Sequence, residues 1–267
     1  MDNLEVREKC LQLTKKFGFV PRAVVWDFIC PKGRTARYKH WRELQKSPLF
    51  SPYILGSGFP EYLILSQKGR SLVGMDALTE VPTVYLEHDE IVMRFFLLLQ
   101  DMGFLEQSWS EGELRMDRVL AIKSLGDGVL AKLPDLLFDL KMEGTPVRYA
   151  LEIERTRKSQ GRYQTMRRAY QRADNVDVLL FGVVEERIEE LIQREIEEAG
   201  LEFYGKDIGF FDLAEFRDKE LHATLRIAGK EISLRDYFLA VVTGNSASAD
   251  FRRHGVRAEL REVSSAS

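Results

Sequence analysis

Residues 133–154 read LPDLLFDLKMEGTPVRYALEIE, and this stretch decides the fold of the second half of the chain. Two apolar runs, 133–140 and 147–154, lie on either side of Glu143-Gly144, a dipeptide typical of a tight turn. The runs are therefore predicted to be neighbouring antiparallel strands joined by a hairpin.

The residues after this hairpin alternate between helix and strand patterns, which is typical of an α/β sheet. One of the strands is apolar at every position, so we expect it to be buried on both faces. The predicted elements are a basic helix at 162–173, the apolar strand at 176–184, an acidic helix at 186–199, a strand at 207–213, a strand at 222–228 and a short helix at 231–241.

The first seventy residues follow a different plan, with three short helices and then a hairpin. Gly18 is placed to end the first helix, and Pro21 is placed to begin the second. A Gly-Ser-Gly-Phe-Pro segment separates the two apolar runs of the hairpin. This order predicts a winged helix-turn-helix. Its parts are helices at 4–17, 22–29 and 34–45 and strands at 53–55 and 62–65.

The whole chain is therefore predicted to be α/β (α+β overall), with a winged helix-turn-helix followed by an α/β domain. The expected boundaries are 1–75 for the winged helix, 76–108 for a linker and connecting helix, 109–242 for the α/β domain and 243–267 for a flexible tail. Within the connecting segment, a helix is predicted over 89–102, with Gly103 as its cap.

Composition indicates a globular protein of 267 residues, with 45% hydrophobic residues. Cys10 and Cys30 are too few for a zinc cage, and their scarcity favours a reducing compartment. The first ten residues are charged throughout, unlike a secretory signal, and the longest apolar runs are too short to span a bilayer. We expect a cytoplasmic protein without a membrane partner.

Charge is unevenly distributed along the chain. Residues 1–50 carry 11 Lys or Arg against 5 Asp or Glu, and residues 155–172 carry seven basic side chains and no acidic one. Residues 185–202 contain eight Glu and only two Arg. Basic zones of this kind favour phosphate binding, although the net charge is −3.

The third helix is the candidate for reading DNA. Tyr38, Trp41 and Leu44 recur every third residue and are predicted to face the core. The remaining side chains would then present donors to the major groove, while the hairpin contacts the backbone or the minor groove. The alternative is a solvated basic face without a partner. The residues predicted to bind DNA here are Arg34, Arg37, Lys39, His40, Arg42 and Lys46.

A carboxylate cluster is expected where the two strands of 133–154 pair. Glu152 and Glu154 are two apart on a strand and share a face, and Asp135 would lie beside them. Three carboxylates repel one another unless a hard cation lies among them, so Mg²⁺ or Mn²⁺ is the expected cofactor if the site is catalytic, and none otherwise. Such an ion would polarise a phosphodiester.

Pro134-Asp135 and Glu152-Ile-Glu154 resemble the signature of the PD-(D/E)XK nuclease superfamily, and the resemblance covers about 109–213. It implies that the α/β domain is restriction-endonuclease-like. It also implies metal ligands at Asp135, Glu152 and, from the preceding segment, Glu111, for which a helix cap is the simpler role. Glu154 stands where the superfamily's catalytic Lys is expected, and Lys158 would have to replace that Lys.

A narrower resemblance covers most of the chain. Its motifs, in chain order, are the winged helix, His88-Asp89, Trp109-Ser-Glu-Gly-Glu-Leu, Pro134-Asp135, LEIERTRKS at 151–159 and Tyr163. This order is similar to the replication-relaxation family of plasmids and other mobile elements, whose members are described as DNA-binding proteins.

Three functions remain open from the sequence. The first is a duplex-DNA-binding protein of a mobile element, acting in replication, relaxation or mobilisation or as a regulator, in which Arg162, Arg168 and Arg172 hold phosphates. The second is a Mg²⁺-dependent endodeoxyribonuclease using Asp135, Glu152 and Glu154, and the third is a protein-interaction module that docks a partner on the acidic helix 186–199. For the acids, the alternative to catalysis is ion pairing with Arg148, Arg155 or Arg157. A homodimer is left open.

Overall fold

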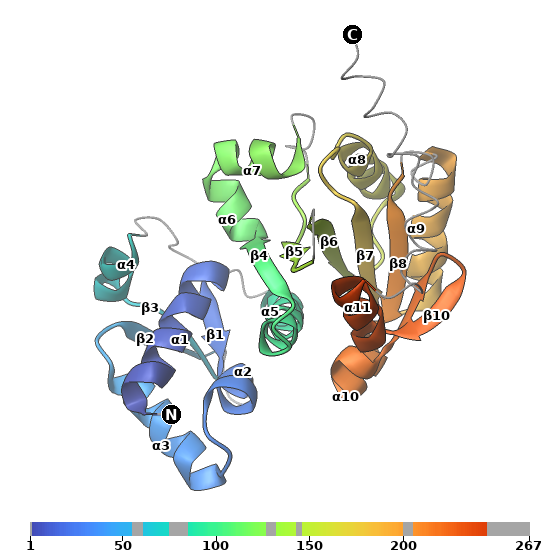
Figure 1. The fold of residues 1–267 in the computed structure, drawn as a ribbon. Coiled ribbons are helices and arrows are strands. Elements are labelled where there is room, and N and C mark those ends of the chain that lie inside the picture. Colours follow the sequence, from blue (N-terminus) through green and yellow to red (C-terminus); the bar gives the residue numbers. More distant parts are fainter. Residues whose placement is uncertain are drawn as a thin grey trace. The chain divides into compact units, whose positions relative to one another are not determined.

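The computed structural model describes residues 2–54, 61–74, 85–126, 132–142, 146–199 and 205–244. The chain divides into two compact units, residues 1–97 and 98–267 (Figure 1). The division falls inside helix α5 (Leu86–Asp101), within the segment expected to connect two domains. None of the helices in the described ranges is both long enough and apolar enough to cross a bilayer.

The first unit combines helices with a small antiparallel sheet whose strand order is β1-β3-β2. The N-terminal helix is fixed at both ends, because the Asp2 side chain accepts hydrogen bonds from the first turn and Gly18 adopts a left-handed conformation (φ 85°). The elements are α1 (Asn3–Phe17), β1 (Phe19–Pro21), α2 (Arg22–Val24), η1 (Val25–Ile29), α3 (Arg34–Lys46), β2 (Phe50–Ile54), β3 (Glu61–Leu65) and α4 (Gln67–Val73), followed by the first part of α5.

Most of the local predictions for this unit are confirmed, with two differences. The second helix has one α-helical turn and then continues as a π-helix over Val25–Ile29. Phe19–Pro21 forms a third strand beside β3. A segment of three residues is too short to show the alternating pattern from which a strand is predicted. The loop between β2 and β3, residues 55–60, lies outside the described residues, as does most of the expected linker.

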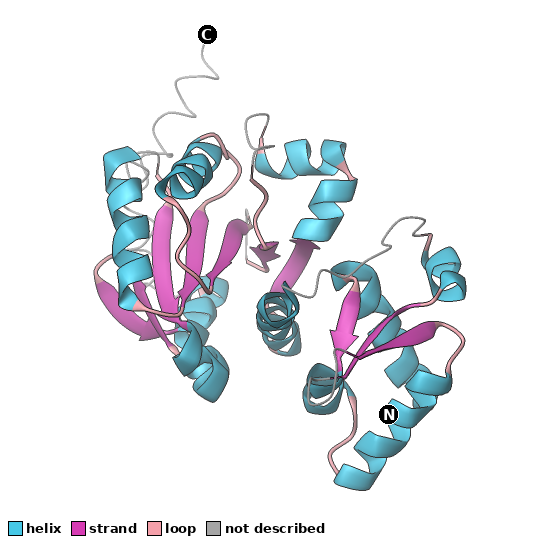
Figure 2. Ribbon diagram, turned by 180° about the vertical axis from the view of Figure 1, so that it is seen from behind, coloured by secondary structure: helices cyan, strands magenta, loops and turns pink. Residues whose placement is uncertain are grey.

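The second unit is built on a seven-stranded sheet of order β10-β9-β8-β7-β6-β5-β4 (Figure 2). Strands β6, β7 and β8 are parallel, and the other neighbouring pairs are antiparallel, so the mixed α/β class is confirmed. The strands are β4 (Leu105–Ser110), β5 (Leu136–Leu140), β6 (Val147–Glu154), β7 (Val178–Val183), β8 (Asp207–Asp212), β9 (Thr224–Ile227) and β10 (Lys230–Ser233).

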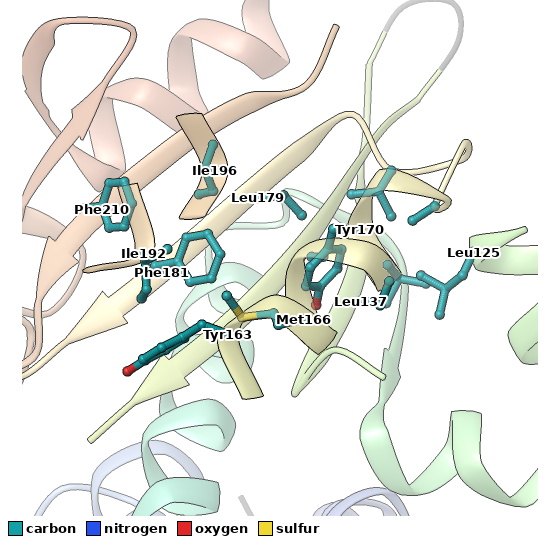
Figure 3. Close-up of a cluster of buried hydrophobic side chains, with 14 of the residues drawn as sticks. Leu125, Leu137, Tyr163, Met166, Tyr170, Leu179, Phe181, Ile192, Ile196 and Phe210 are labelled. Atoms are coloured by element: carbon teal, nitrogen blue, oxygen red, sulfur yellow. The ribbon is translucent and has the colours of Figure 1, made fainter. Parts of the chain in front are cut away.

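Helices cover both faces of this sheet. On one face, buried side chains of α6, α7, α8 and α9 pack on alternate residues of the strands, and Figure 3 shows Met166 and Tyr170 of α8 beside Leu137 and Phe181. On the other face, the rings of Phe138 and Tyr149 stack with 5.0 Å between their centroids, and both contact the Phe238 ring of α11 edge-on. The helices are α6 (Glu111–Met116), α7 (Arg118–Leu125), α8 (Gln160–Gln171), α9 (Glu186–Ala199), α10 (Leu213–Lys219), η4 (Glu220–His222) and α11 (Leu234–Thr243).

Several predicted boundaries shift in the second unit. The strand predicted at 133–140 begins at Leu136, after the proline and a bend at Asp135. The helix predicted at 231–241 is wrong in its first residues, because Lys230–Ser233 pairs with β9 across a turn at Ala228-Gly229 and the helix begins only after Ser233. Residues 143–145, with the predicted hairpin turn, and residues 245–267, with most of the predicted tail, lie outside the described residues.

Candidate functional site

The pairing of β5 with β6 brings Asp135 next to Glu152. The register sets Leu136 opposite Leu151, and the backbone N–H of Asp135 donates to the Leu151 carbonyl at 3.1 Å. The Asp135 side chain continues the connection, since its Oδ2 accepts a hydrogen bond from the Ile153 N–H at 2.7 Å. The predicted convergence of these acids therefore has a backbone origin.

Glu152 is a buried carboxylate, 1% exposed, with a hydrogen-bond donor at Oε1 and only an ion-pair partner at Oε2 among the described residues. Its Oε1 accepts a hydrogen bond from the Tyr170 hydroxyl of α8. Its Oε2 lies 2.8 Å from Nζ of Lys132. A buried carboxylate needs such partners, because the loss of its hydration would otherwise cost roughly several kcal/mol.

Lys132 is the residue that the sequence analysis did not find. Its Nζ donates to the Leu133 carbonyl at 2.9 Å and lies 3.6 Å from Oδ1 of Asp135, in addition to its ion pair with Glu152. One ammonium group therefore joins Asp135 and Glu152. The spacing Lys132-Leu-Pro-Asp135 was a signal for it, since a lysine three residues before a candidate acid can fold back onto it.

Glu154 shares a different lysine. Its side chain is fully buried, and Oε1 lies 2.5 Å from Nζ of Lys158, four residues further along the chain. Its Oε2 has no hydrogen-bond donor among the residues that the structure describes. Lys158 does reach back toward the cluster as the sequence analysis required, and it does so by pairing with Glu154 itself.

The protonation of the cluster follows from its burial. Burial raises the pKa of Glu152 to about 7, and Asp135 adds to the rise while Lys132 and Tyr170 oppose it. Burial also raises the pKa of Glu154, against the opposing charge of Lys158. Burial alone would lower the pKa of Lys132, but the charges of Glu152 and Asp135 raise it above its ordinary value. The lysine therefore remains an ammonium.

The two glutamates at the start of α6 have other partners. Glu113 closes a capping box with Ser110, in which each residue's side chain meets the other's backbone N–H. Glu111 forms an ion pair with Arg115, and its backbone N–H donates to the Asp135 carbonyl at 3.2 Å. The charge of Glu111 also contributes to the raised pKa of Lys132, so this carboxylate lies near the cluster.

The arginines that were weighed as alternative partners of the acids are placed differently. Arg148 forms a two-pronged ion pair with Asp139 at 2.7 Å for each contact, and its guanidinium lies over the Trp109 ring. Arg157 lines a surface hollow of about 520 Å³ with Arg187 and Arg194 of α9. Glu152 forms an ion pair with Lys132, and Glu154 forms one with Lys158.

A divalent metal does not fit the cluster as it is arranged. Carboxylate oxygens are suitable ligands for Mg²⁺ or Mn²⁺. However, the ammonium of Lys132 lies between the oxygens of Asp135 and Glu152 that such an ion would use. In the described ranges, no three His, Cys, Asp or Glu side chains are grouped so that they could hold a metal ion.

The outer face of α3 is basic, with two corrections to the predicted residues. Tyr38 was expected in the core but is 39% exposed, and His40 was expected to face outward but is 9% exposed. The reason is geometric: a three-residue step covers 300°, so a stripe spaced only by threes turns away from the core. The buried side chains are His40, Trp41 and Leu44, Arg37 is half-buried, and the exposed basic ones are Arg34, Lys39, Arg42 and Lys46.

Tyr38 belongs to an aromatic and cationic cluster that the sequence analysis missed. Its ring meets Trp26 of η1 edge-on at 4.9 Å between centroids. The guanidinium of Arg22 lies over the Trp26 ring at 4.8 Å, and that of Arg34 lies over Tyr38 at 5.9 Å. These contacts fix the angle between the second helical segment and α3.

The basic helix α8 has the faces that were predicted. Tyr163, Met166 and Tyr170 are buried against the sheet, and Arg162, Arg168 and Arg172 are exposed. In the acidic helix α9, several of the glutamates are paired within the unit. Glu189 pairs with Arg226, and Glu195 and Glu198 each lie 3.5 Å from Arg167.

No family model, no curated protein and no solved structure matches this chain. The resemblances drawn from the sequence motifs therefore stay predictions, and function has to be argued from the residues described above.

Proposed function

We propose that the chain binds duplex DNA, with the first unit acting as a winged helix-turn-helix and the second as a nuclease-like domain that contacts the DNA backbone. The observation that carries the proposal is the row of exposed basic side chains on α3. Arginine and lysine at such positions can donate to guanine in the major groove and to phosphates.

The connectivity of the first unit supports this assignment. Helix, strand, two helical segments and a two-stranded hairpin, with the sheet order β1-β3-β2, agree with the winged-helix plan. In that plan α3 is the recognition helix, and the hairpin of β2 and β3 is the wing. The bound DNA, by the family resemblance, would be a site on a plasmid or another mobile element.

Binding of a labelled duplex over a range of salt concentrations tests the proposal. The triple variant Arg34→Ala/Lys39→Ala/Arg42→Ala should bind more weakly and with a smaller salt dependence, because fewer counterions are released. The matched control is Arg7→Ala/Lys9→Ala/Lys15→Ala, which removes three exposed charges from α1. Equal losses in the two triple variants, or none in either, would contradict a recognition role for α3.

A metal-dependent endodeoxyribonuclease is the second candidate. It is favoured by the approach of Asp135 to Glu152 across neighbouring strands, whereas the Lys132 ammonium that lies against both carboxylates stands against it. Supercoiled plasmid incubated with the protein and Mg²⁺ or Mn²⁺ should then be nicked or linearised. Glu152→Ala is the decisive control, since cleavage that survives this change belongs to a contaminant.

A further inference from the structure

The carboxylate cluster of the second unit holds a cation of its own. Three oxygen atoms surround Nζ of Lys132: Oε2 of Glu152 at 2.8 Å, the Leu133 carbonyl at 2.9 Å and Oδ1 of Asp135 at 3.6 Å. The contact with the Leu133 carbonyl is a hydrogen bond, and the two carboxylates hold the ammonium as ion pairs. The lysine is therefore fixed in place by the same side chains that a metal would need.

Each of the two acids uses one oxygen for a protein donor and the other for the lysine. Asp135 accepts the Ile153 N–H at Oδ2, and Glu152 accepts the Tyr170 hydroxyl at Oε1. The oxygens that are left to face the centre of the cluster, Oδ1 and Oε2, are the two that face Lys132. A metal could not use these oxygens without displacing the ammonium.

A lysine and a divalent ion cannot share this position. Mg²⁺ binds carboxylate oxygens at about 2.0–2.1 Å and retains several water molecules in an octahedral shell. Its charge would lie within a few Å of the ammonium nitrogen, in a region where water screens charges poorly, so the repulsion would be strong. The two cations are therefore expected to compete.

We propose that Lys132 is the resident cation of this cluster and excludes a divalent metal from it, so that the cluster stabilises the second unit instead of supporting metal-dependent cleavage. The proposal does not depend on DNA binding by α3, because all of its residues lie in the second unit. It separates the two candidate functions given above.

Titration of the full-length protein with Mn²⁺, followed by electron paramagnetic resonance of the free ion, is the test. Lys132→Met removes the charge and keeps an unbranched side chain. Lys141→Met is the matched control, because it changes an exposed lysine just after the other end of β5. The wild type and the control should show only weak, unsaturable binding. Lys132→Met should bind at least about tenfold more tightly, since the site is then free for the ion.

A second measurement keeps the proposal testable if Lys132→Met folds poorly. Removing one partner of a buried ion pair leaves the other uncompensated, so Lys132→Met alone should lower the melting temperature by on the order of 10 °C. The double variant Lys132→Met/Glu152→Gln removes both charges and should melt at a higher temperature than Lys132→Met. A double variant that melts lower than both single variants would contradict the pairing.

Two results would overturn the exclusion of metal. The first is saturable Mn²⁺ binding by the wild type that Glu152→Gln abolishes. The second is a folded Lys132→Met variant that binds Mn²⁺ no better than the wild type does. Neither result concerns α3, so DNA binding would stand or fall by its own test.

Discussion

Nζ of Lys132 and Oε2 of Glu152 lie 2.8 Å apart, although one residue precedes β5 and the other lies near the end of β6. The antiparallel pairing of these strands creates the contact, and the Tyr170 hydroxyl of α8 completes it from the helical layer. A strand pair and a crossover helix thus hold the carboxylate of Glu152. The contributions of these contacts to stability can be measured directly.

The hydroxyl of Tyr170 is expected to contribute more to stability than that of another buried tyrosine. Tyr170→Phe removes a donor to a buried carboxylate, and we expect a loss of about 1–3 kcal/mol in the free energy of unfolding. Tyr149→Phe is the matched change, because Tyr149 is equally buried but its hydroxyl donates to the uncharged Tyr237 hydroxyl, at 3.4 Å. Urea denaturation of both variants is the measurement. A Tyr149→Phe cost equal to or above that of Tyr170→Phe would contradict the charge-assisted bond.

The stability of the protein should depend on the protonation of Glu152. The folded state raises the pKa of Glu152 from 4.5 to about 7, so between these values the folded protein binds more protons than the unfolded chain. This contribution is therefore fully present below pH 4.5 and is lost as the pH rises to about 7. The linked free energy is on the order of 3 kcal/mol.

The comparison of wild type with Glu152→Gln isolates this effect, because glutamine does not titrate. The stability of the wild type relative to Glu152→Gln should fall as the pH is raised from about 4.5 to about 7, as measured by urea unfolding at each pH. Glu197→Gln, on the exposed side of α9, should follow the wild type throughout. A constant difference between wild type and Glu152→Gln would show that folding does not raise the pKa of Glu152.

Gly182 lies where the sheet has no room for a side chain. A Cβ at this position would lie 2.7 Å from Leu213 and 2.8 Å from both Ile153 and Phe211. Gly182→Ala should therefore destabilise the second unit by about 1–3 kcal/mol. Gly161→Ala is the control, because no atom lies within 4 Å of its Cβ and alanine favours the helix. In thermal denaturation, Gly182→Ala should have a lower melting temperature than the wild type. Gly161→Ala should have the same melting temperature or a higher one.

Arg168 of α8 and Arg172, the C-cap residue of that helix, are expected to contact phosphates if the second unit lies along the DNA backbone. Arg168→Gln and Arg172→Gln should each weaken duplex binding without changing sequence preference, and each should reduce the salt slope by about 1. Arg217→Gln on α10, which packs on the other face of the sheet, should have no effect. If the dependence of binding on salt concentration is unchanged in all three variants, Arg168 and Arg172 do not contact phosphates.

Local patterns predicted much of the fold because they depend on neighbours in the sequence. The amphipathic stripe of Tyr163, Met166 and Tyr170 and the apolar run around Val178–Val183 specify a helix and a buried strand by periodicity alone. The pairing of β5 with β6 followed from two runs with a short connection. The π-helix at Val25–Ile29 and the strand at Phe19–Pro21 carry no such pattern, since packing in the first unit creates them.

The composition of the candidate site was predicted in part. Asp135, Glu152 and Lys158 lie where the motif suggested, because the motif is a strand pair with its flanking residues. His40 and Tyr38 were assigned to the wrong faces of α3. A spacing of three residues falls short of a full helical turn, so it does not define which side of the helix faces the core. The hydroxyl of Tyr170 was counted as packing, because the sequence does not show what a buried polar tip will meet.

By itself, the sequence determined the helices, most of the strands and the fact that acids would gather where two strands meet, because periodicity, capping residues and short connections act over a few positions. Only the tertiary structure decided what those acids hold. Lys132 reaches Glu152 across a strand pairing, and Tyr170 reaches it from the helical layer, so both contacts join parts of the chain that no local pattern connects. Such contacts decide the charge balance of a buried cluster. They therefore decide whether its carboxylates are neutralised by a side chain of the protein or are left to bind a metal.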